Sequence, residues 1–183
     1  DVLADIWASP FRASPFFYGD IAAGPASPPC QDYSVTASLH DATYPRLIEP
    51  VRDLLVQLGL PYVIENVEGA RRELHNPIRL CGSSFGLGVR RHRYFEVNFP
   101  VSLTPPCAHH LQPEPIDVTG AGGPCDKPNP TGGIHRKPRN LAHAREVMGI
   151  DWMTRPELSE AVPPAFTEWL GAELLAHLGS VAA

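Results

Sequence analysis

Apolar residues are spaced in two different ways along the first third of the chain, and each spacing predicts a different element. A short run of small apolar residues, 21–26, predicts a buried strand that ends at a pair of prolines. Apolar side chains then recur every three or four residues through 44–58, which predicts a helix closed by Gly59. Pro50 falls inside this pattern, so the helix either begins near Glu49 or is kinked.

A second apolar run, 61–67, predicts another strand, and its carboxyl end is polar. Strand, loop, helix and strand in this order predict a βαβ unit with two parallel strands. Open α/β sheets bind ligands at the carboxyl ends of their strands. We therefore expect Cys30, which follows the first strand, to share one sheet edge with Glu65 and Asn66, which end the second.

The pattern predicts one further strand over 93–99, and then a loop-rich region with nine prolines over 100–138. We expect residues 1–99 to form an α/β core that carries the catalytic residues and is incomplete at its amino terminus. Residues 100–138 are expected to form a small irregular lobe, and residues 139–183 to form helices that pack back on the core. The predicted fold class is α/β, with a partial Rossmann-like sheet, helices and the small lobe.

Three helices are predicted after the lobe. Helical spacing covers 139–150, and Thr154 with Glu157 forms a capping-box pattern at the start of the second helix. The stretch 163–179 predicts an amphipathic helix that Gly179 closes.

Composition allows one globular domain, since 183 residues with 43% hydrophobic content can bury a core. No apolar run approaches the roughly 18 residues of a membrane span, and the start does not resemble a signal peptide. The net charge of −5 disfavours a generic nucleic-acid binder. However, residues 71–93 hold six arginines and one acid, and arginine suits bidentate contacts to phosphates or bases.

The cysteines show no CxxC pair, and without a secretion signal we expect reduced thiols in a cytoplasmic protein: Cys30, Cys81, Cys107 and Cys125. Cys107, His109, His110 and Cys125 could in principle gather a metal ion. Their spacing fits no standard zinc pattern, so we expect no metal site.

Four short motifs occur in order: SPPCQ at 27–31, ENV at 65–67, RRHRYFE at 90–96 and VPPAFTEWLG at 162–171. Together they resemble ordered motifs of the DNA (cytosine-5) methyltransferase family, in the compact form common in bacteriophages, over residues 23–178. The resemblance implies methyl transfer from S-adenosylmethionine to carbon 5 of a cytosine that is flipped out of double-stranded DNA.

Cys30 resembles the nucleophile of this family, whose thiolate adds to carbon 6 of cytosine so that the resulting enamine can attack the methyl group. Pro28 and Pro29 would stiffen the loop and hold the sulfur in attacking geometry, with Gln31 fixing the far side. Arginine charge nearby would favour the thiolate.

Glu65 resembles the acid that hydrogen-bonds the exocyclic amine and ring nitrogen 3 of cytosine. Asn66 resembles the residue that holds the Pro-Cys loop in place. Arg91 and Arg93 match the arginines of a Gln-x-Arg-x-Arg motif; the first would contact the cysteine loop or the DNA backbone, and the second the cytosine carbonyl. Val89 stands where the motif has glutamine.

The lobe over 100–138 lies where the family keeps its target-recognition region, and its small size implies modest sequence selectivity. Further basic residues are candidate phosphate contacts, which position a duplex without reading it: Arg71, Arg72, Arg79, Arg90, Arg136 and Lys137.

The donor site departs from the family pattern. Relatives have a loop of the form Asp-Leu-Phe-x-Gly-x-Gly-Gly around the methionine part of S-adenosylmethionine, and no such loop occurs here. Only 29 residues precede Cys30, and the first residue is Asp1 rather than Met, so our expectation is that the chain is a fragment. We expect poor methylation by this chain alone, with a missing segment or a separate chain completing the donor site. The candidate donor contacts that remain are Asp20, Pro164, Thr167 and Glu168.

Two alternative functions stay open. One is a non-catalytic DNA-binding remnant or one half of a split methyltransferase. The other is a cysteine hydrolase with Cys30 as nucleophile, although none of the eight histidines sits in a recognisable partner motif, and Glu65 and Asn66 would be unexplained.

Overall fold

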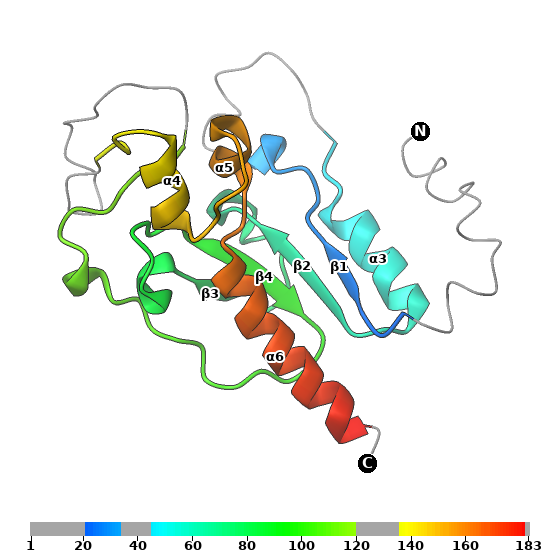
Figure 1. The fold of residues 1–183 in the computed structure, drawn as a ribbon. Helices are drawn as coiled ribbons and strands as arrows, with labels where there is room; N and C mark the ends of the chain where they lie inside the picture. The colour runs from blue at the N-terminus through cyan, green and yellow to red at the C-terminus, as the bar shows by residue number, and fades with distance from the viewer. Residues whose placement is uncertain (1–20, 34–44, 120–135, 182–183) are drawn as a thin grey trace.

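Four short strands form one mixed sheet in the spatial order β1-β2-β4-β3 (Figure 1). In this computed structural model, the described residues are 21–33, 45–119 and 136–181. The parallel pair is β1–β2, whereas β4 runs antiparallel to both of its neighbours. Together with its helices, the sheet gives the α/β fold predicted from the sequence. The strands are β1 (Gly24–Ala26), β2 (Tyr62–Asn66), β3 (Ile78–Leu80) and β4 (Arg93–Val97).

The βαβ unit is confirmed, with helix α3 (Ile48–Leu58) between the two parallel strands in the chain. The helix begins early enough to place Pro50 in its first turn, where a missing N–H breaks no helical hydrogen bond. The first of the two alternatives for this helix is therefore correct. Gly59 ends the helix in the left-handed conformation, with φ of 67°, as its position predicted.

Helices cover both faces of the sheet. Ile64 belongs to a buried cluster with Ile48 and Leu55 of α3, whereas its neighbour Val63 packs with the cluster that contains Phe166. Successive residues of a strand point to opposite faces, so α3 covers one face and the start of the last helix covers the other. By the same alternation, Glu65 and Asn66 point to different faces.

The three predicted carboxyl-terminal helices are present as α4 (Leu141–Met148), α5 (Arg155–Glu160) and α6 (Pro164–Val181). The capping box is confirmed, because the Thr154 N–H donates to the Glu157 carboxylate at 2.7 Å. A further cluster of buried side chains packs beneath α4 and α5, and it includes Val118 from the loop region: Val89, Val118, Ala144, Val147, Met148, Ile150 and Leu158.

The prediction for the last helix is wrong in two respects. Helix α6 continues through Gly179 to Val181, since a helical glycine costs only about 0.5–1 kcal/mol relative to alanine and ends a helix only in a left-handed turn. Only Phe166 and Leu170 are buried, and the second half of α6 extends past the sheet with Leu175 exposed (Figure 1). The helix is therefore not amphipathic along its length.

The strand β3 was not predicted, and regular structure is sparse in the described part of the loop region. Residues 100–119 contain the 3-10 turn η6 (His109–Leu111) and a bridge between Ile116 and Arg136. The Ser102 N–H donates to Glu173 of α6 at 2.7 Å, which fixes the start of this segment. Among the described residues, none of the helices has the length and apolar content that crossing a membrane requires.

Candidate active site

The carboxyl ends of β1 and β2 and the beginning of β4 meet at one edge of the sheet. Cys30 lies four residues beyond β1, exposed, directly before the 3-10 turn η2 (Gln31–Tyr33). Glu65 and Asn66 are the last residues of β2. Because β4 is antiparallel to β2, its first residue, Arg93, comes to the same edge. Pro29 and Gln31 flank Cys30 at the surface.

Glu65 and Arg93 form an ion pair at this edge. Their Oε1 and Nε atoms are 3.0 Å apart, and each side chain is only 14% exposed. Burial raises the pKa of Glu65 above its ordinary value, against the opposing effects of Arg93, a hydrogen bond from Ser27 and the charge of Arg91. Glu65 is therefore a carboxyl group that holds a proton more readily than a solvated glutamate does.

Arg91 lies beside this pair and is held by the carboxyl-terminal part of the chain. Its guanidinium donates to the backbone carbonyls of Ala161 at 2.6 Å and Ser159 at 2.8 Å, at the end of α5. Burial, followed by the charge of Arg93, lowers the pKa of Arg91 to about 9, so the side chain stays charged at neutral pH. Negative charge on Cys30 favours the protonated forms of both arginines, so the thiol shares their electrostatic environment.

The Pro-Cys loop is tied to β2 by Asn66. This side chain is 1% exposed, and its Nδ2 donates to the carbonyl of Pro28 at 2.9 Å. The far end of the loop is packed as well, because Tyr33 is buried and its carbonyl oxygen lies directly against Gly69. The loop around Cys30 is therefore anchored on both sides, although Cys30 itself is exposed.

An apolar cavity of about 300 Å³ lies between the sheet and α6, with Glu65 in its wall. Its other lining residues include Val63 and Phe95 from the sheet and Leu170 from α6. Thr167 also lines it, whereas Glu168 is exposed outside this lining, and Pro164 begins α6. Of the candidate donor contacts, Thr167 therefore reaches the cavity, and Asp20 lies outside the described residues.

Two of the six candidate phosphate contacts lie exposed near this edge. Arg71 and Arg72 follow the turn after β2, and the guanidinium of Arg71 lies 5.8 Å from the centre of the Tyr94 ring. Both arginines are available to an external anion.

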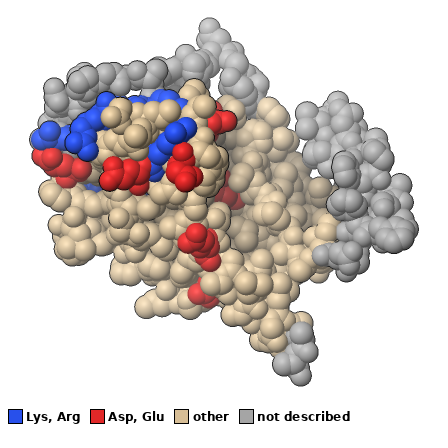
Figure 2. Space-filling model, viewed as in Figure 1, with Lys and Arg blue, Asp and Glu red and all other residues tan. Residues whose placement is uncertain are grey.

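The other four candidate phosphate contacts have partners within the protein. Arg136 pairs with Glu114 and Lys137 with Asp117, each at 2.7 Å, and Figure 2 shows basic side chains gathered at one end of the visible face with acidic ones next to them. Arg79 donates to the Cys107 sulfur at 3.4 Å, and Arg90 donates to the carbonyl of Gln112 at 3.1 Å. These contacts make them weaker candidates than Arg71 and Arg72.

Sequence reasoning missed one group of polar residues and named only two members, Cys107 and His109, of another. One is a buried network in which the Glu96 carboxylate accepts two hydrogen bonds from Arg52, at 2.6 and 2.7 Å. The other brings Cys81 and His92 together with Cys107 and His109, whereas His110 is not a member and Cys125 lies outside the described residues. Their spacing along the chain carried no recognisable signal, because the residues come from separate segments.

No protein-family model matches the chain, and no curated protein is significantly similar to it. The resemblance to DNA (cytosine-5) methyltransferases therefore depends on four short motifs and on the way in which the fold groups their residues.

Proposed function

We propose that the chain carries the catalytic centre of a DNA (cytosine-5) methyltransferase that acts on double-stranded DNA with S-adenosylmethionine as methyl donor. The observation that carries this proposal is the buried Glu65–Arg93 pair beside the anchored Pro-Cys loop. Covalent activation of cytosine needs a nucleophile, a general acid and positive charge. This edge of the sheet carries a thiol, a carboxyl group with a raised pKa and two arginines.

In this reaction the Cys30 thiolate forms a bond to carbon 6 of the flipped cytosine. Glu65 hydrogen-bonds or protonates ring nitrogen 3, so the electrons displaced by the addition are not left as an unstabilised anion. Carbon 5 then attacks the methyl group of the donor, whose sulfonium sulfur takes the bonding pair. Loss of the carbon 5 proton to a base and release of the Cys30 thiolate restore the aromatic ring.

The raised pKa of Glu65 supports its part in this sequence, because a general acid works best when its pKa approaches the working pH. Arg93, which pairs with Glu65, would bind the cytosine carbonyl. Arg91, which the backbone carbonyls at the end of α5 hold, would add positive charge near the Cys30 thiolate. The exposed Arg71 and Arg72 would bind DNA phosphates, and the 100–138 lobe would lie against the duplex.

The cavity next to Glu65 is a candidate place for part of the donor. Its volume of about 300 Å³ is at the lower end of the usual range for small-molecule sites. It suits a fragment of S-adenosylmethionine more readily than the whole molecule, so we infer that a further segment or chain completes the donor site. The reaction would take place in the cytoplasm of a bacterium or of a phage-infected cell.

The proposal is tested with duplex DNA in which 5-fluorocytosine replaces the target base, because loss of the carbon 5 proton is then blocked and the covalent adduct persists. We expect the chain to bind DNA and, with donor and any completing segment, to form an adduct that Cys30→Ser abolishes. Cys125→Ser is the control, since it removes a thiol that the proposal does not use. DNA binding without any adduct would favour the non-catalytic remnant, and an adduct that survives Cys30→Ser would refute the mechanism.

A further inference from the structure

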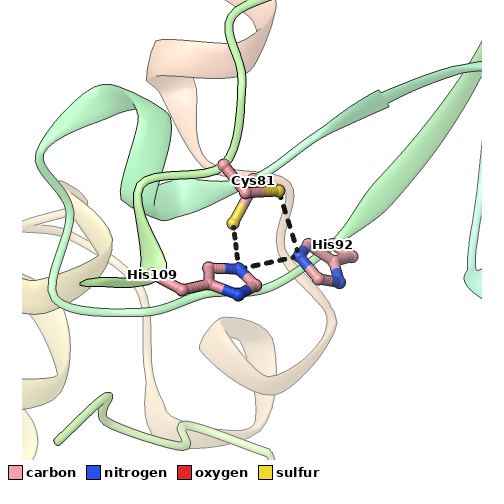
Figure 3. Close-up of side chains that lie close together, drawn as sticks. Cys81, His92 and His109 are labelled. Carbon is pink, nitrogen blue, oxygen red and sulfur yellow. Dashed lines mark hydrogen bonds between the residues drawn. The ribbon is translucent and has the colours of Figure 1, made fainter. Parts of the chain in front are cut away.

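Four side chains of the kinds that bind zinc converge next to the start of β4. They are Cys81, His92, Cys107 and His109, and one ligand atom from each lies within 4.8 Å of all the others. Figure 3 shows Cys81, His92 and His109 turned toward one small space, with a sulfur and ring nitrogens facing it. Cys81 is buried and the other three are half-buried, so this group is partly shielded from water.

The distances within this group suit a single tetrahedral ion. The two Nε2 atoms of His92 and His109 are 3.2 Å apart, and the His109 Nε2 is 3.2 Å from the Cys81 sulfur. The Cys107 sulfur lies 3.7 Å from the His92 Nε2. A tetrahedral zinc ion with bonds of about 2.0 Å to nitrogen and 2.3 Å to sulfur separates its ligand atoms by about 3.3–3.8 Å.

We propose that these residues bind one Zn²⁺ ion as a closed Cys₂His₂ site. Two thiolates and two imidazoles match the preference of zinc, whereas magnesium and calcium require oxygen ligands. Four protein ligands leave no open position for a substrate, so the ion has a structural role. This proposal replaces the expectation from sequence spacing that the chain has no metal site.

The surroundings of the two sulfur atoms support thiolate ligands. The Arg79 guanidinium donates to the Cys107 sulfur at 3.4 Å, and the Ser83 hydroxyl lies 3.0 Å from the Cys81 sulfur. Ser83 also accepts a hydrogen bond from the Ala108 N–H at 3.0 Å, which joins the two cysteine segments. Partners of this kind orient metal ligands and stabilise their charge. Arg79 therefore acts here as a partner of the metal site and not as a DNA contact.

The ion would tie the loop region to the sheet. Cys81 follows β3 and His92 precedes β4, whereas Cys107 and His109 belong to the segment 100–119, which has little regular structure of its own. Binding at such a site contributes folding free energy directly. The inference depends on no residue of the proposed catalytic mechanism.

Elemental analysis of the full chain, purified under reducing conditions without chelator, tests the site. We expect about one zinc ion per chain, and Co²⁺ in its place should give the strong visible bands of tetrahedral cobalt with a thiolate charge-transfer band. Cys107→Ser and His109→Gln should each bind less than about a tenth of the wild-type zinc. His110→Gln is the matched control, because this exposed neighbour is outside the group and should keep its zinc.

Arg79→Gln adds a test in which every ligand is retained. We expect zinc affinity to fall about 10-fold or more, with no change in Arg72→Gln. A wild-type chain without zinc, without the cobalt spectrum and with a Tm that chelator does not lower would overturn the site. So would a Cys81–Cys107 disulfide under reducing conditions, or zinc content unchanged in both ligand variants. None of these measurements uses methylation, so failure here is distinct from failure of the proposed function.

Discussion

The Glu65 carboxylate forms an ion pair with the Arg93 guanidinium, with Oε1 and Nε 3.0 Å apart and both side chains only 14% exposed. Glu65 is near the end of β2 and Arg93 begins β4, and these strands are paired antiparallel. The geometry of the pair is therefore set by the register of two central strands, which is more rigid than a loop.

Replacement of Glu65 by glutamine should slow adduct formation with 5-fluorocytosine duplex DNA by about 100-fold or more, the usual contribution of a general acid. The pH dependence has a definite sign. Because the pKa of Glu65 is raised, its protonated fraction and the rate that depends on it fall as pH rises through that pKa. Glu65→Gln should lose this dependence. Glu68→Gln, at an exposed acid three residues on, should keep both the rate and the pH profile.

Asn66→Ala should loosen the Pro-Cys loop. It leaves the Pro28 carbonyl without its buried donor, which costs about 1–3 kcal/mol of the free energy of unfolding. Urea denaturation and adduct formation per folded molecule would be measured together. Asn98→Ala is the comparison, because the Asn98 side-chain oxygen accepts a hydrogen bond from the Tyr62 N–H at the opposite end of β2. It should reduce stability and leave the adduct rate unchanged; equal rates in the two variants would contradict the anchoring role of Asn66.

Gly69→Ala should displace the far end of the same loop. A methyl group at this position would lie 1.8 Å from the Tyr33 carbonyl oxygen, so the backbone must move, which should lower the free energy of unfolding by about 1–3 kcal/mol.

Gly179→Ala should have the opposite effect. The added methyl group meets no atom within 4 Å and lies inside α6, so it should raise the free energy of unfolding by about 0.5–1 kcal/mol. Thermal unfolding of both variants checks the two signs, and destabilisation by Gly179→Ala would show that α6 ends earlier.

The network around Glu96 should make the fold sensitive to acid. Burial alone would raise the pKa of Glu96, but hydrogen bonds from Arg52, the His75 N–H and the Tyr62 hydroxyl outweigh it and lower the pKa. A lowered pKa contributes stability that is present above the unfolded value of 4.5 and is lost as pH falls through the folded value.

Glu96→Gln should remove that acid sensitivity and cost about 3–5 kcal/mol at neutral pH, because Arg52 remains as a buried unpaired charge. Urea titrations at pH 7 and at a series of pH values below 4.5 would measure both effects. Glu49→Gln, at an exposed position of α3, should behave like the wild type at each pH. A loss below about 1 kcal/mol in Glu96→Gln would contradict the assignment of a buried ion pair.

Sequence patterns predicted the elements whose signals are local. The βαβ unit follows from two apolar runs around a helical repeat, and this alone places Cys30 and Glu65 at one edge. The strand β3 was missed because a strand of three residues is too short to show an alternation of apolar and polar positions. The end of α6 was wrong because Gly179 is a helical glycine here, and the helix was not amphipathic because its second half has exposed apolar side chains such as Leu175 and Val181.

Contacts between distant segments could not be predicted in this way. The two cysteines and two histidines of the proposed zinc site come from three segments between 81 and 109, and only the pairing of β3 with β4 brings the first two together. The buried partnership of Arg52 with Glu96 likewise joins a helix to a strand 44 residues away.

The two hydrogen bonds that Arg91 donates to the end of α5 bear on which substitutions the sequence around α5 can accept. Both acceptors, at Ser159 and Ala161, are backbone carbonyls, and every amino acid offers the same oxygen there. Selection for the contacts of Arg91 would therefore conserve the backbone path around residues 159 and 161, whereas the side chains at these two positions could vary. Chimeras that exchange the segment around α5 should tolerate almost any residue at these two positions. A one-residue insertion before Ser159 would instead shift both carbonyl oxygens, so that Arg91 would lose both hydrogen bonds together.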